Sequence, residues 1–538
     1  MSRLLTATLK GSARERGRAH GERFKAEVRE SGILDYYLGY CERLLNRPGI
    51  AKRLGISVVH ELCARAQSDE ARGLADGFCE ATGLDRRAVG RALVMPDALN
   101  FLVGLHAAVR PAPAPALGCT SVAAWGPYTA HGRLLFARNL DFAGNGVWDK
   151  FPVLARHEPD HGLPYVAFTT AGGILDGITG VNAEGLTLAL HQHLSWDVSL
   201  WGTRPVLDLG QETLRTCRTI EEAIELISNW PTTGGWTVVL THWKSRQACA
   251  IERTARRCFV HFARDGWFVR ANDYEEPALK GAEIEYTPWR GGSRARVARA
   301  QALLQANKGR LDAAAMASIL RDHLDSERGV TRAFAQTIAG PSNMTSVVID
   351  AEAGEVWAAE GPAPVCEGSY RRLKLWEDSA PGEELAVPTL LTEAQRAGYQ
   401  RYMEALLAWE RSRDEEAAAG RLGDATTADP HDPIYRYMRG FFCLRAGDAR
   451  AAAEHFESGI QEPDLPHRTR AQRLWLARSL DALGRRDEAL RHYAAVSAAE
   501  GAGRPLGAAA ERGARAPYRL ELAREVLPDL LFGDVYAY

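Results

Sequence analysis

The dipeptide Gly118-Cys119 is the feature of this sequence with the clearest chemical potential. If the peptide bond inside it is cut, Cys119 gains a free α-amine beside its thiol. An α-amine titrates near pH 8, so about a tenth of it is neutral at pH 7 and able to accept a proton. The thiol has an ordinary pKa of about 8.5 and needs only a neighbouring cation to become a nucleophilic thiolate. The dipeptide therefore predicts a nucleophile that supplies its own base, without a catalytic histidine.

The residues after Cys119 predict which groups lie beside it. Two segments of strand-like composition flank a turn near His131, which is typical of a hairpin. In such a hairpin Cys119 lies opposite Phe142, to within about two residues. Arg138 and Asp141 then lie next to the thiol, where the guanidinium favours the thiolate and the carboxylate accepts hydrogen bonds from the α-ammonium. Thiol, guanidinium and carboxylate are expected to meet at one strand end.

The segment before the hairpin, from residue 1 to about 110, is expected to be helical. Apolar residues recur there at three- and four-residue spacing over 15–45, 58–81 and 85–109. The proline-alternating run 110–117 then predicts an extended, exposed linker. This linker would present the Gly118–Cys119 bond for cleavage.

From Cys119 to about residue 380 the pattern changes to strands with intervening helices. Strand segments that flank helices favour sheets packed together and covered by helices. The predicted strands are 120–125, 134–142, 165–171, 177–182, 186–191, 237–244, 248–253, 258–263, 267–271, 345–350 and 355–360. The predicted helices are 208–228, with a restart at Thr219, then 293–307 and 311–324.

From about residue 390 to the end the pattern is helical again. The series Gly447-Asp448, Ala452 and Phe456 recurs with the same spacing as Gly484-Arg485, Ala489 and Tyr493. This repetition is typical of tetratricopeptide repeats, and a plain helical bundle is the alternative. In either case we expect a module that binds a protein partner or supports the enzyme. The predicted domains are a helical pro-segment (1–118), a catalytic core (119–385) and a helical repeat domain (386–538).

The composition excludes several classes of partner. The chain has 538 residues and a net charge of −2, which gives no field that would attract nucleic acid or anionic lipid. Its nine cysteines contain no C-x-x-C pair, so they indicate reduced thiols and no local zinc site. The N-terminus has no apolar signal-peptide segment. We expect a cytoplasmic protein with no metal and no cofactor.

Several of these motifs occur together in one known family. In their order along the chain they resemble the acyl-coenzyme A:6-aminopenicillanic acid acyltransferase (isopenicillin N acyltransferase) family of N-terminal-nucleophile (Ntn) hydrolases, which are related to the bile-salt and penicillin-V amidases. The resemblance covers residues 1 to about 375. It is carried by residues 15–21, 72–77, 118–121, 138–141, 180–186 and 345–348.

The resemblance implies an α+β fold, an αββα sandwich, with autocatalytic cleavage before the nucleophile and two chains that stay associated. Cys119 matches the family's nucleophile, and Arg138 and Asp141 match the polar pair beside it. The resemblance also assigns a role to two later positions. Asn272 matches a donor to the oxyanion, and Arg296, or less closely Arg294, matches a basic residue near the active site.

The chain departs from the family after Gly185-Leu186, where related enzymes usually place an asparagine. Here the strand continues as His191-Gln192-His193, so Gln192 or His191 is expected to replace that asparagine in the oxyanion hole and to contact the substrate. The two histidines share one strand face, but no third metal ligand has a suggestive spacing. Aromatic residues are candidates for pocket walls, with core packing as the alternative. These are Trp125, Phe142, Trp148 and Trp236.

The predicted function is a self-cleaving amidohydrolase or acyltransferase that forms a thioester at Cys119. Its substrate would be a small N-acyl amide or an acyl thioester, including acyl-coenzyme A as a substrate. One alternative is a cysteine peptidase with a separate histidine base, although no histidine stands in a recognisable motif. Another is a catalytically inactive sandwich that binds partners through its C-terminal repeats.

Overall fold

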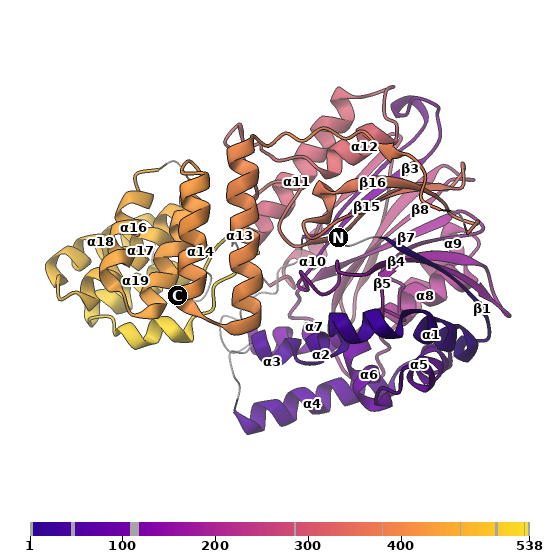
Figure 1. The fold of residues 1–538 in the computed structure, drawn as a ribbon, viewed down its shortest axis with the longest axis horizontal. Helices are drawn as coiled ribbons and strands as arrows, with labels where there is room; N and C mark the ends of the chain where they lie inside the picture. The colour runs from indigo at the N-terminus through magenta and orange to yellow at the C-terminus, as the bar shows by residue number, and fades with distance from the viewer. Residues whose placement is uncertain are drawn as a thin grey trace. The chain divides into compact units, whose positions relative to one another are not determined.

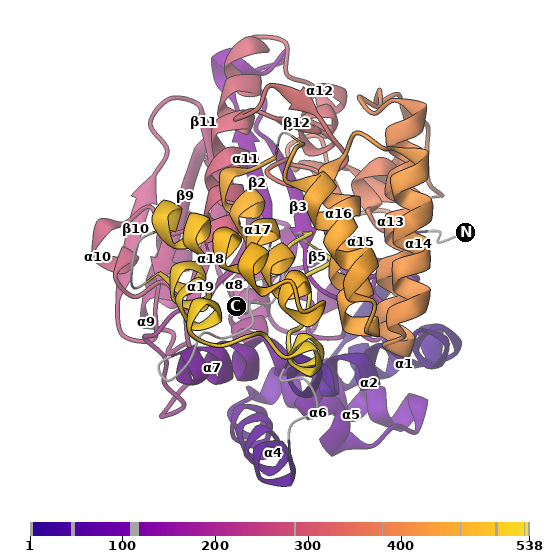
Figure 2. The ribbon, with the colours of Figure 1, turned by 90° about the vertical axis from the view of Figure 1, so that its left-hand side faces the viewer.

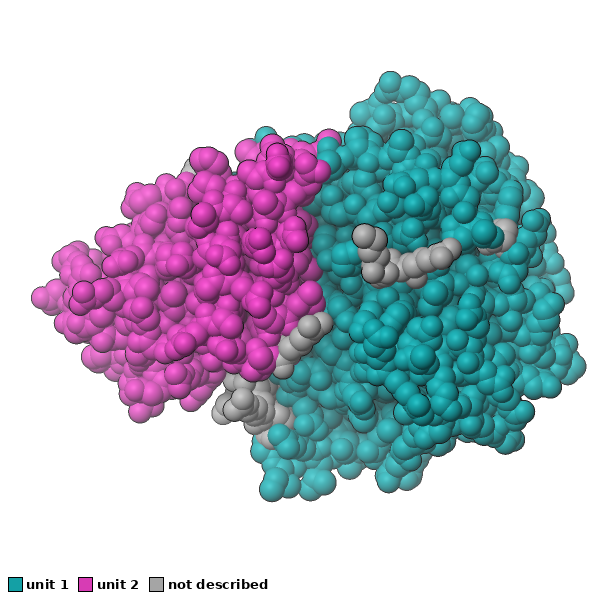
Figure 3. Space-filling view, in the orientation of Figure 1, with its two compact units in different colours: residues 1–329, 336–389 teal, residues 330–335, 390–538 magenta. Residues whose placement is uncertain are grey.

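The computed structural model describes residues 4–44, 49–107, 118–284, 287–378, 380–462, 464–500, 504–531 and 533–535. It consists of two compact units, which are coloured separately in Figure 3. Unit 1 contains Met1–Gly329 and Gln336–Thr389, and unit 2 contains Val330–Ala335 and Leu390–Tyr538. The predicted pro-segment and the predicted catalytic core, except for Val330–Ala335, therefore lie in unit 1.

Unit 1 is built around two β-sheets. The eight-stranded sheet has the order β1-β4-β5-β6-β7-β8-β9-β10. All its neighbouring strands are antiparallel except β1 and β4, which are parallel. Its strands are β1 (Leu5–Gly11), β4 (Pro152–Pro159), β5 (Tyr165–Thr170), β6 (Thr179–Asn182), β7 (Leu186–His193), β8 (Gly235–His242), β9 (Gln247–Arg253) and β10 (Cys258–Phe262).

The seven-stranded sheet has the order β11-β2-β3-β14-β15-β16-β17. The strand that follows Cys119, β2, lies between β11 and β3, so the nucleophile candidate stands at the end of an interior strand. The strands are β2 (Thr120–Ala124), β3 (Leu135–Asp141), β11 (Trp267–Arg270), β14 (Asn343–Asp350), β15 (Glu355–Glu360), β16 (Ser369–Lys374) and β17 (Glu384–Leu385). The short strands β12 (Leu324–Asp325) and β13 (Val330–Thr331) lie outside both sheets.

The two sheets pack against each other through apolar side chains that alternate along their strands. Leu154 and Val166 of the eight-stranded sheet share one buried cluster with Phe136 and Val347 of the seven-stranded sheet. Because successive side chains of a strand point to opposite faces, the remaining apolar residues lie on the outer faces and need their own cover.

Helices supply that cover on both sides. The outer face of the eight-stranded sheet packs on α8 (Val206–Thr216) and α9 (Ile220–Asn229). The outer face of the seven-stranded sheet packs on α11 (Thr287–Ala306) and α12 (Ala313–Leu320). Figure 1 shows these layers, and the predicted αββα sandwich is confirmed. One further short helix is α10 (Pro277–Lys280).

The pro-segment adds two closely packed helices to the eight-stranded sheet. A side chain at Gly17 of α1 would come within 1.9 Å of the Leu74 carbonyl oxygen, so the backbones of α1 and α5 touch at this point. Glycine at this position therefore allows the close approach of the two helices. The pro-segment helices are α1 (Ala13–Ser31), α2 (Ile33–Leu38), α3 (Tyr40–Leu44), α4 (Ile50–Arg65), α5 (Asp69–Thr82), α6 (Arg86–Leu93) and α7 (Met95–Ala107).

Two predictions for the pro-segment are corrected by the structure. The chain does not begin as helix, because Leu5–Gly11 forms β1 and buries Ala7 and Leu9 under α1 and α5. The predicted helix over 58–81 is two helices, since Ser68 accepts a hydrogen bond from the Ala71 N–H at 3.1 Å and begins a new one. The predicted linker 110–117 lies outside the described residues.

Among the described helices, none is by itself long and apolar enough to cross a membrane. The pair α6 and α7 passes that test only together, and the two helices meet at a bend of 59°.

The described residues of unit 2 form seven α-helices, each of which packs on the next along the chain (Figure 2). The repeated glycines Gly447 and Gly484 both have a positive φ, at +102° and +75°. Gly447 directly follows α15, and Gly484 follows α17 after one residue. The repeated residues Ala452, Phe456, Ala489 and Tyr493 are all fully buried. The helices are α13 (Glu393–Ser412), α14 (Glu415–Ala428), α15 (Pro433–Ala446), α16 (Ala449–Gly459), α17 (Pro466–Ala482), α18 (Arg486–Glu500) and α19 (Pro505–Arg515). The tetratricopeptide assignment stays a prediction.

Candidate active site

Cys119 lies at the start of β2, and 5% of its surface is exposed. In the β2–β3 hairpin Thr120 pairs with Asn139 and Ser121 pairs with Arg138. The register therefore differs from the predicted one by about two residues, within the stated margin. Arg138 and Asp141 remain beside Cys119 in this register.

Arg138 directs its guanidinium at the sulfur. Its Nη2 lies 3.6 Å from Cys119 Sγ. Nη1 donates to the Ile178 carbonyl oxygen and, at 2.7 Å, to the Thr179 hydroxyl, and Nη2 also donates to the Leu190 carbonyl oxygen. The buried Nε of Arg138 has no hydrogen-bond partner among the described residues. Within the described part of the chain, no carboxylate lies within 4.0 Å of this guanidinium. Burial lowers the pKa of Arg138, and the nearby Cys119 opposes that shift because a thiolate would be the counterion.

Asp141 lies against the bond expected to be cut. The Gly118 N–H donates to the Asp141 carbonyl oxygen at 3.2 Å, and a side chain at Gly118 would meet the Asp141 carboxylate at 3.0 Å. Burial raises the pKa of this carboxyl to about 7, although a hydrogen bond from Asn343 at 2.7 Å and the charges of Arg296 and Arg138 oppose the rise. At neutral pH the carboxyl is therefore able both to accept and to donate a proton.

Arg296 and Asn272 form a second polar pair beside β2. Arg296 Nε donates to Thr120 Oγ1 at 3.1 Å, and its Nη2 donates to Asn272 Oδ1 at 3.2 Å. Asn272 Nδ2 donates in turn to the backbone oxygen of Gln192 at 3.1 Å. Burial lowers the pKa of Arg296, with the charges of Asp141 and Cys119 opposing the shift. The structure thus brings all five predicted catalytic residues into one connected group. Arg294 has 59% of its side chain exposed and lies 3.7 Å from the carboxylate of Asp273.

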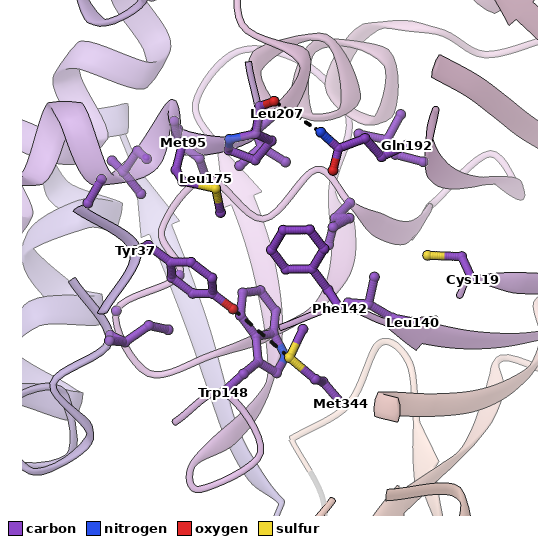
Figure 4. A pocket seen from close by; sticks show the side chains of 18 of the residues that line it. Tyr37, Met95, Cys119, Leu140, Phe142, Trp148, Leu175, Gln192, Leu207 and Met344 are labelled. Atoms are coloured by element: carbon purple, nitrogen blue, oxygen red, sulfur yellow. Dashed lines mark hydrogen bonds between the residues drawn. The ribbon is translucent and has the colours of Figure 1, made fainter. Parts of the chain in front are cut away.

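A pocket with a cavity volume of about 90 Å³ begins at Cys119 (Figure 4). Its lining is largely aliphatic and aromatic, which is typical of a site for an apolar ligand. The residues that line it are Ile33, Leu34, Tyr37, Ala92, Leu93, Met95, Pro96, Cys119, Leu140, Asp141, Phe142, Trp148, Gly172, Gly173, Leu175, Ile178, Leu190, Gln192, Leu207, Trp236 and Met344.

Four of the six residues considered as pocket walls or substrate contacts line this pocket, namely Phe142, Trp148, Gln192 and Trp236. Trp125 does not, because it packs against the apolar cluster between the two sheets. The prediction for Trp125 as a pocket wall is therefore wrong, and core packing is its role.

The prediction that His191 contacts the substrate is also wrong. Side chains alternate along β7, so Gln192 faces the pocket while His191 points between the sheets. There its Nε2 forms a hydrogen bond of 2.7 Å with Ser121 Oγ. Burial lowers the pKa of His191 well below its ordinary value, and the nearby charge of Arg138 lowers it further. A fully buried imidazole that bridges two sheets is not a substrate contact.

The pro-segment contributes part of the pocket that the sequence did not reveal. Tyr37 of α2 and Met95 at the start of α7 line the wall opposite the catalytic core, as Figure 4 shows. The Tyr37 hydroxyl donates to the Ala143 carbonyl oxygen at 3.1 Å, so the two parts are joined across the pocket. Asn343, which holds Asp141, was also missed, because no local pattern connects β14 with β3.

Among the residues that the structure describes, no group of three or more His, Cys, Asp or Glu side chains is arranged to hold a metal ion. His193, the second histidine of β7, bonds to Thr237 Oγ1 at 2.8 Å. All nine cysteines are free thiols.

Comparison with known proteins identifies the core of unit 1. Residues 129–362 match the model of a family described as acyl-coenzyme A:6-aminopenicillanic acid acyl-transferase. The match begins after Cys119 and includes Arg138, Asp141, Asn272 and Arg296. A search of curated proteins gives no match. The family indicates an acyltransferase-type enzyme with small acyl substrates. Over residues 129–362, the core of this chain is therefore similar to the acyl-coenzyme A:6-aminopenicillanic acid acyl-transferase family.

Proposed function

We propose that this protein is a self-cleaving N-terminal-cysteine amidohydrolase or acyltransferase that carries an apolar acyl group on Cys119. The observation that supports this most directly is the contact of 3.6 Å between Arg138 Nη2 and Cys119 Sγ at one end of an apolar pocket. A buried cation without a carboxylate partner favours a thiolate, and the pocket offers room for an acyl chain.

Self-cleavage would use Asp141 as the proton carrier. The thiol of Cys119 attacks the carbonyl carbon of Gly118, so that a C–S bond forms while the C–N bond breaks. The thiol proton passes to the Asp141 carboxylate and from there to the departing nitrogen. Water then hydrolyses the thioester, which returns the thiol and leaves a carboxylate on Gly118 and an α-amine on Cys119. The pKa of about 7 suits Asp141 to both transfers.

Turnover would use the new α-amine. It takes the thiol proton, the sulfur attacks the acyl carbon of the substrate, and the leaving amine or thiol departs with that proton. Water or an acceptor amine then takes the acyl group from the sulfur. Arg138 stabilises the thiolate before it attacks the substrate and again when the acyl group leaves the sulfur. Arg296 and Asn272 add donors beside Cys119, and donors aimed at the developing oxyanion are worth about 3–4 kcal/mol.

The pocket favours acyl groups with an extended apolar part. Each methylene that leaves water for an apolar site contributes about 0.8 kcal/mol. We therefore expect acyl donors with longer chains, presented as amides or as thioesters such as acyl-coenzyme A, to acylate Cys119 faster than acetyl donors.

Acyl trapping tests the proposal. The purified protein is mixed with a series of N-acyl amides and acyl thioesters of increasing chain length, and the mass of the larger fragment is measured. We expect one acyl group on the peptide that begins at Cys119, with a rate that rises with chain length. Cys119→Ala should take up none, whereas Cys258→Ala, which removes a partly exposed thiol elsewhere, should label normally. Labelling of another residue, or of none, would refute the proposed enzyme and favour an inactive scaffold.

A further inference from the structure

Among the described residues that line the pocket, Gln192 is the one with a side-chain amide. We propose that its Oε1 selects acyl donors that carry an N–H or O–H group within an otherwise apolar acyl chain. This inference rests on the proposed function, since it concerns the group that Cys119 receives. It assigns Gln192 a role different from that of the missing asparagine, which would donate a hydrogen bond.

The orientation of Gln192 follows from Asn100 on α7. Asn100 Nδ2 donates to the Gly235 carbonyl oxygen at 3.1 Å. Because a carbonyl oxygen can only accept, this bond places the amide nitrogen of Asn100 toward Gly235 and leaves its Oδ1 facing Gln192. The pro-segment thus presents a fixed acceptor to Gln192.

That acceptor fixes the side chain of Gln192. Its Nε2 donates to Asn100 Oδ1 at 3.1 Å and to the Pro96 carbonyl oxygen at 3.1 Å. An amide nitrogen has two hydrogens, so both are used by these two acceptors. A rotation of the amide by 180° would set oxygen against two acceptors and lose both bonds. Gln192 therefore has no hydrogen left to donate to an oxyanion.

The remaining polar atom of Gln192 is its oxygen. In Figure 4 Oε1 points toward the open middle of the pocket, away from the dashed bond of Nε2. Within the described part of the chain, no donor occupies this oxygen. A plain hydrocarbon chain would remove water from the oxygen without replacing the hydrogen bond, whereas an N–H or O–H at the same place would satisfy it.

Paired acyl donors test this inference. The probes are the thioesters of decanoic acid and of a series of hydroxydecanoic acids, with the hydroxyl moved along the chain. We expect the wild-type protein to be acylated faster by at least one hydroxylated probe than by the plain one, by about three- to tenfold. Gln192→Met keeps the length of the side chain and removes the oxygen, so it should abolish or reverse this preference.

Two further variants keep the test decisive. Asn100→Leu leaves Gln192 in place but removes the acceptor that orients it, so the preference should also fall, even if Gln192→Met does not fold. Leu190→Met changes another lining residue of the same strand face to the same new residue, and its preference should stay that of the wild type. An equal preference in wild type and Gln192→Met, or a wild type that favours the plain chain at every position, would overturn the inference. If no probe acylates Cys119 at all, the proposed function itself fails.

Discussion

Two buried arginines of unit 1 have opposite electrostatic surroundings. Arg16 of the pro-segment is paired with Glu70, and its Nη1 lies 3.1 Å from His157 Nδ1. His157 Nε2 is in turn 2.7 Å from a carboxylate oxygen of Asp176. Arg138 is equally buried, but its bonds go to neutral oxygens and to the sulfur of Cys119.

The difference separates a structural cluster from a reactive one. Burial alone would raise the pKa of Asp176, but its interaction with His157 and a hydrogen bond from Gln211 hold it below its ordinary value. Each charge in that cluster has a partner, so removal of one member should cost stability. The counterion of Arg138 would be the Cys119 thiolate. Removal of this arginine should therefore lower the reactivity of the Cys119 thiol. The comparison predicts which arginine matters for which property.

The largest expected effect is on thiol reactivity. Arg138→Met removes the cation beside Cys119 Sγ, and we expect alkylation of Cys119 by iodoacetamide at pH 7 to slow by about 100-fold, which corresponds to about 2.7 kcal/mol. The substitution also leaves the buried carbonyl oxygens of Ile178 and Leu190 without this donor, so some stability should be lost and the rate is taken on the folded fraction. The measurement is peptide mass spectrometry of alkylated Cys119 over time. An unchanged rate in a folded variant would remove the distinction between the two arginines.

The second effect is on stability. Arg16→Met leaves Glu70 and His157 without their common partner, and we expect the free energy of unfolding to fall by about 2 kcal/mol, less than for a fully buried pair because Glu70 is partly exposed. Urea unfolding should be measured in the Cys119→Ala background, in which the chain stays whole. In the Arg16→Met variant that keeps Cys119, the alkylation rate of Cys119 in the folded fraction should equal that of the wild type. A variant that keeps its stability but loses thiol reactivity would reverse the assignment.

A smaller effect concerns the pH dependence of self-cleavage. The pKa of Asp141 is about 7, so its carboxylate fraction rises about tenfold from pH 6 to pH 8, and the cleavage rate should rise with it. Asp141→Asn should lower the cleavage rate and abolish its rise between pH 6 and pH 8. The measurement follows freshly refolded precursor on a gel at a series of pH values. If the cleavage rate of Asp141→Asn still rises near pH 7, another group carries the proton.

The smallest effect is expected at Arg14, which serves as a control for Arg16. Arg14 is on the same helix and pairs with Glu80, but both side chains are substantially exposed. Exposed ion pairs contribute little to stability, so Arg14→Ala should leave the midpoint of thermal unfolding unchanged within error. A clear loss of stability would show that burial is not what distinguishes Arg16.

The sequence was informative where the relevant contacts are local. A hairpin places Arg138 and Asp141 beside Cys119 by register alone, and an error of about two residues does not move them away. Alternation along β7 was also predictable, but it does not say which face meets the pocket. His191 and Gln192 therefore could not be distinguished until the sheet was placed between its neighbours.

Contacts across long sequence separations were not predictable in this way. Tyr37 lines the pocket because the pro-segment docks on the core, and no local pattern reports that docking. The strand β4 was missed because prolines stand at both its ends and Arg156 and His157 interrupt its apolar residues. Arg156 is accommodated because its guanidinium donates to the carbonyl oxygens of Lys374 and Leu375, which lie far along the chain.

The central claim is that Cys119 becomes a free N-terminus and then works with its own amine. The direct measurement is the intact mass and N-terminal sequence of the purified protein, taken on the same sample that is assayed for acyl transfer. Self-cleavage predicts two associated fragments, 1–118 and 119–538, with the larger beginning Cys-Thr-Ser, and a single chain for Cys119→Ala. A sample that turns over substrate while every chain remains whole would contradict it.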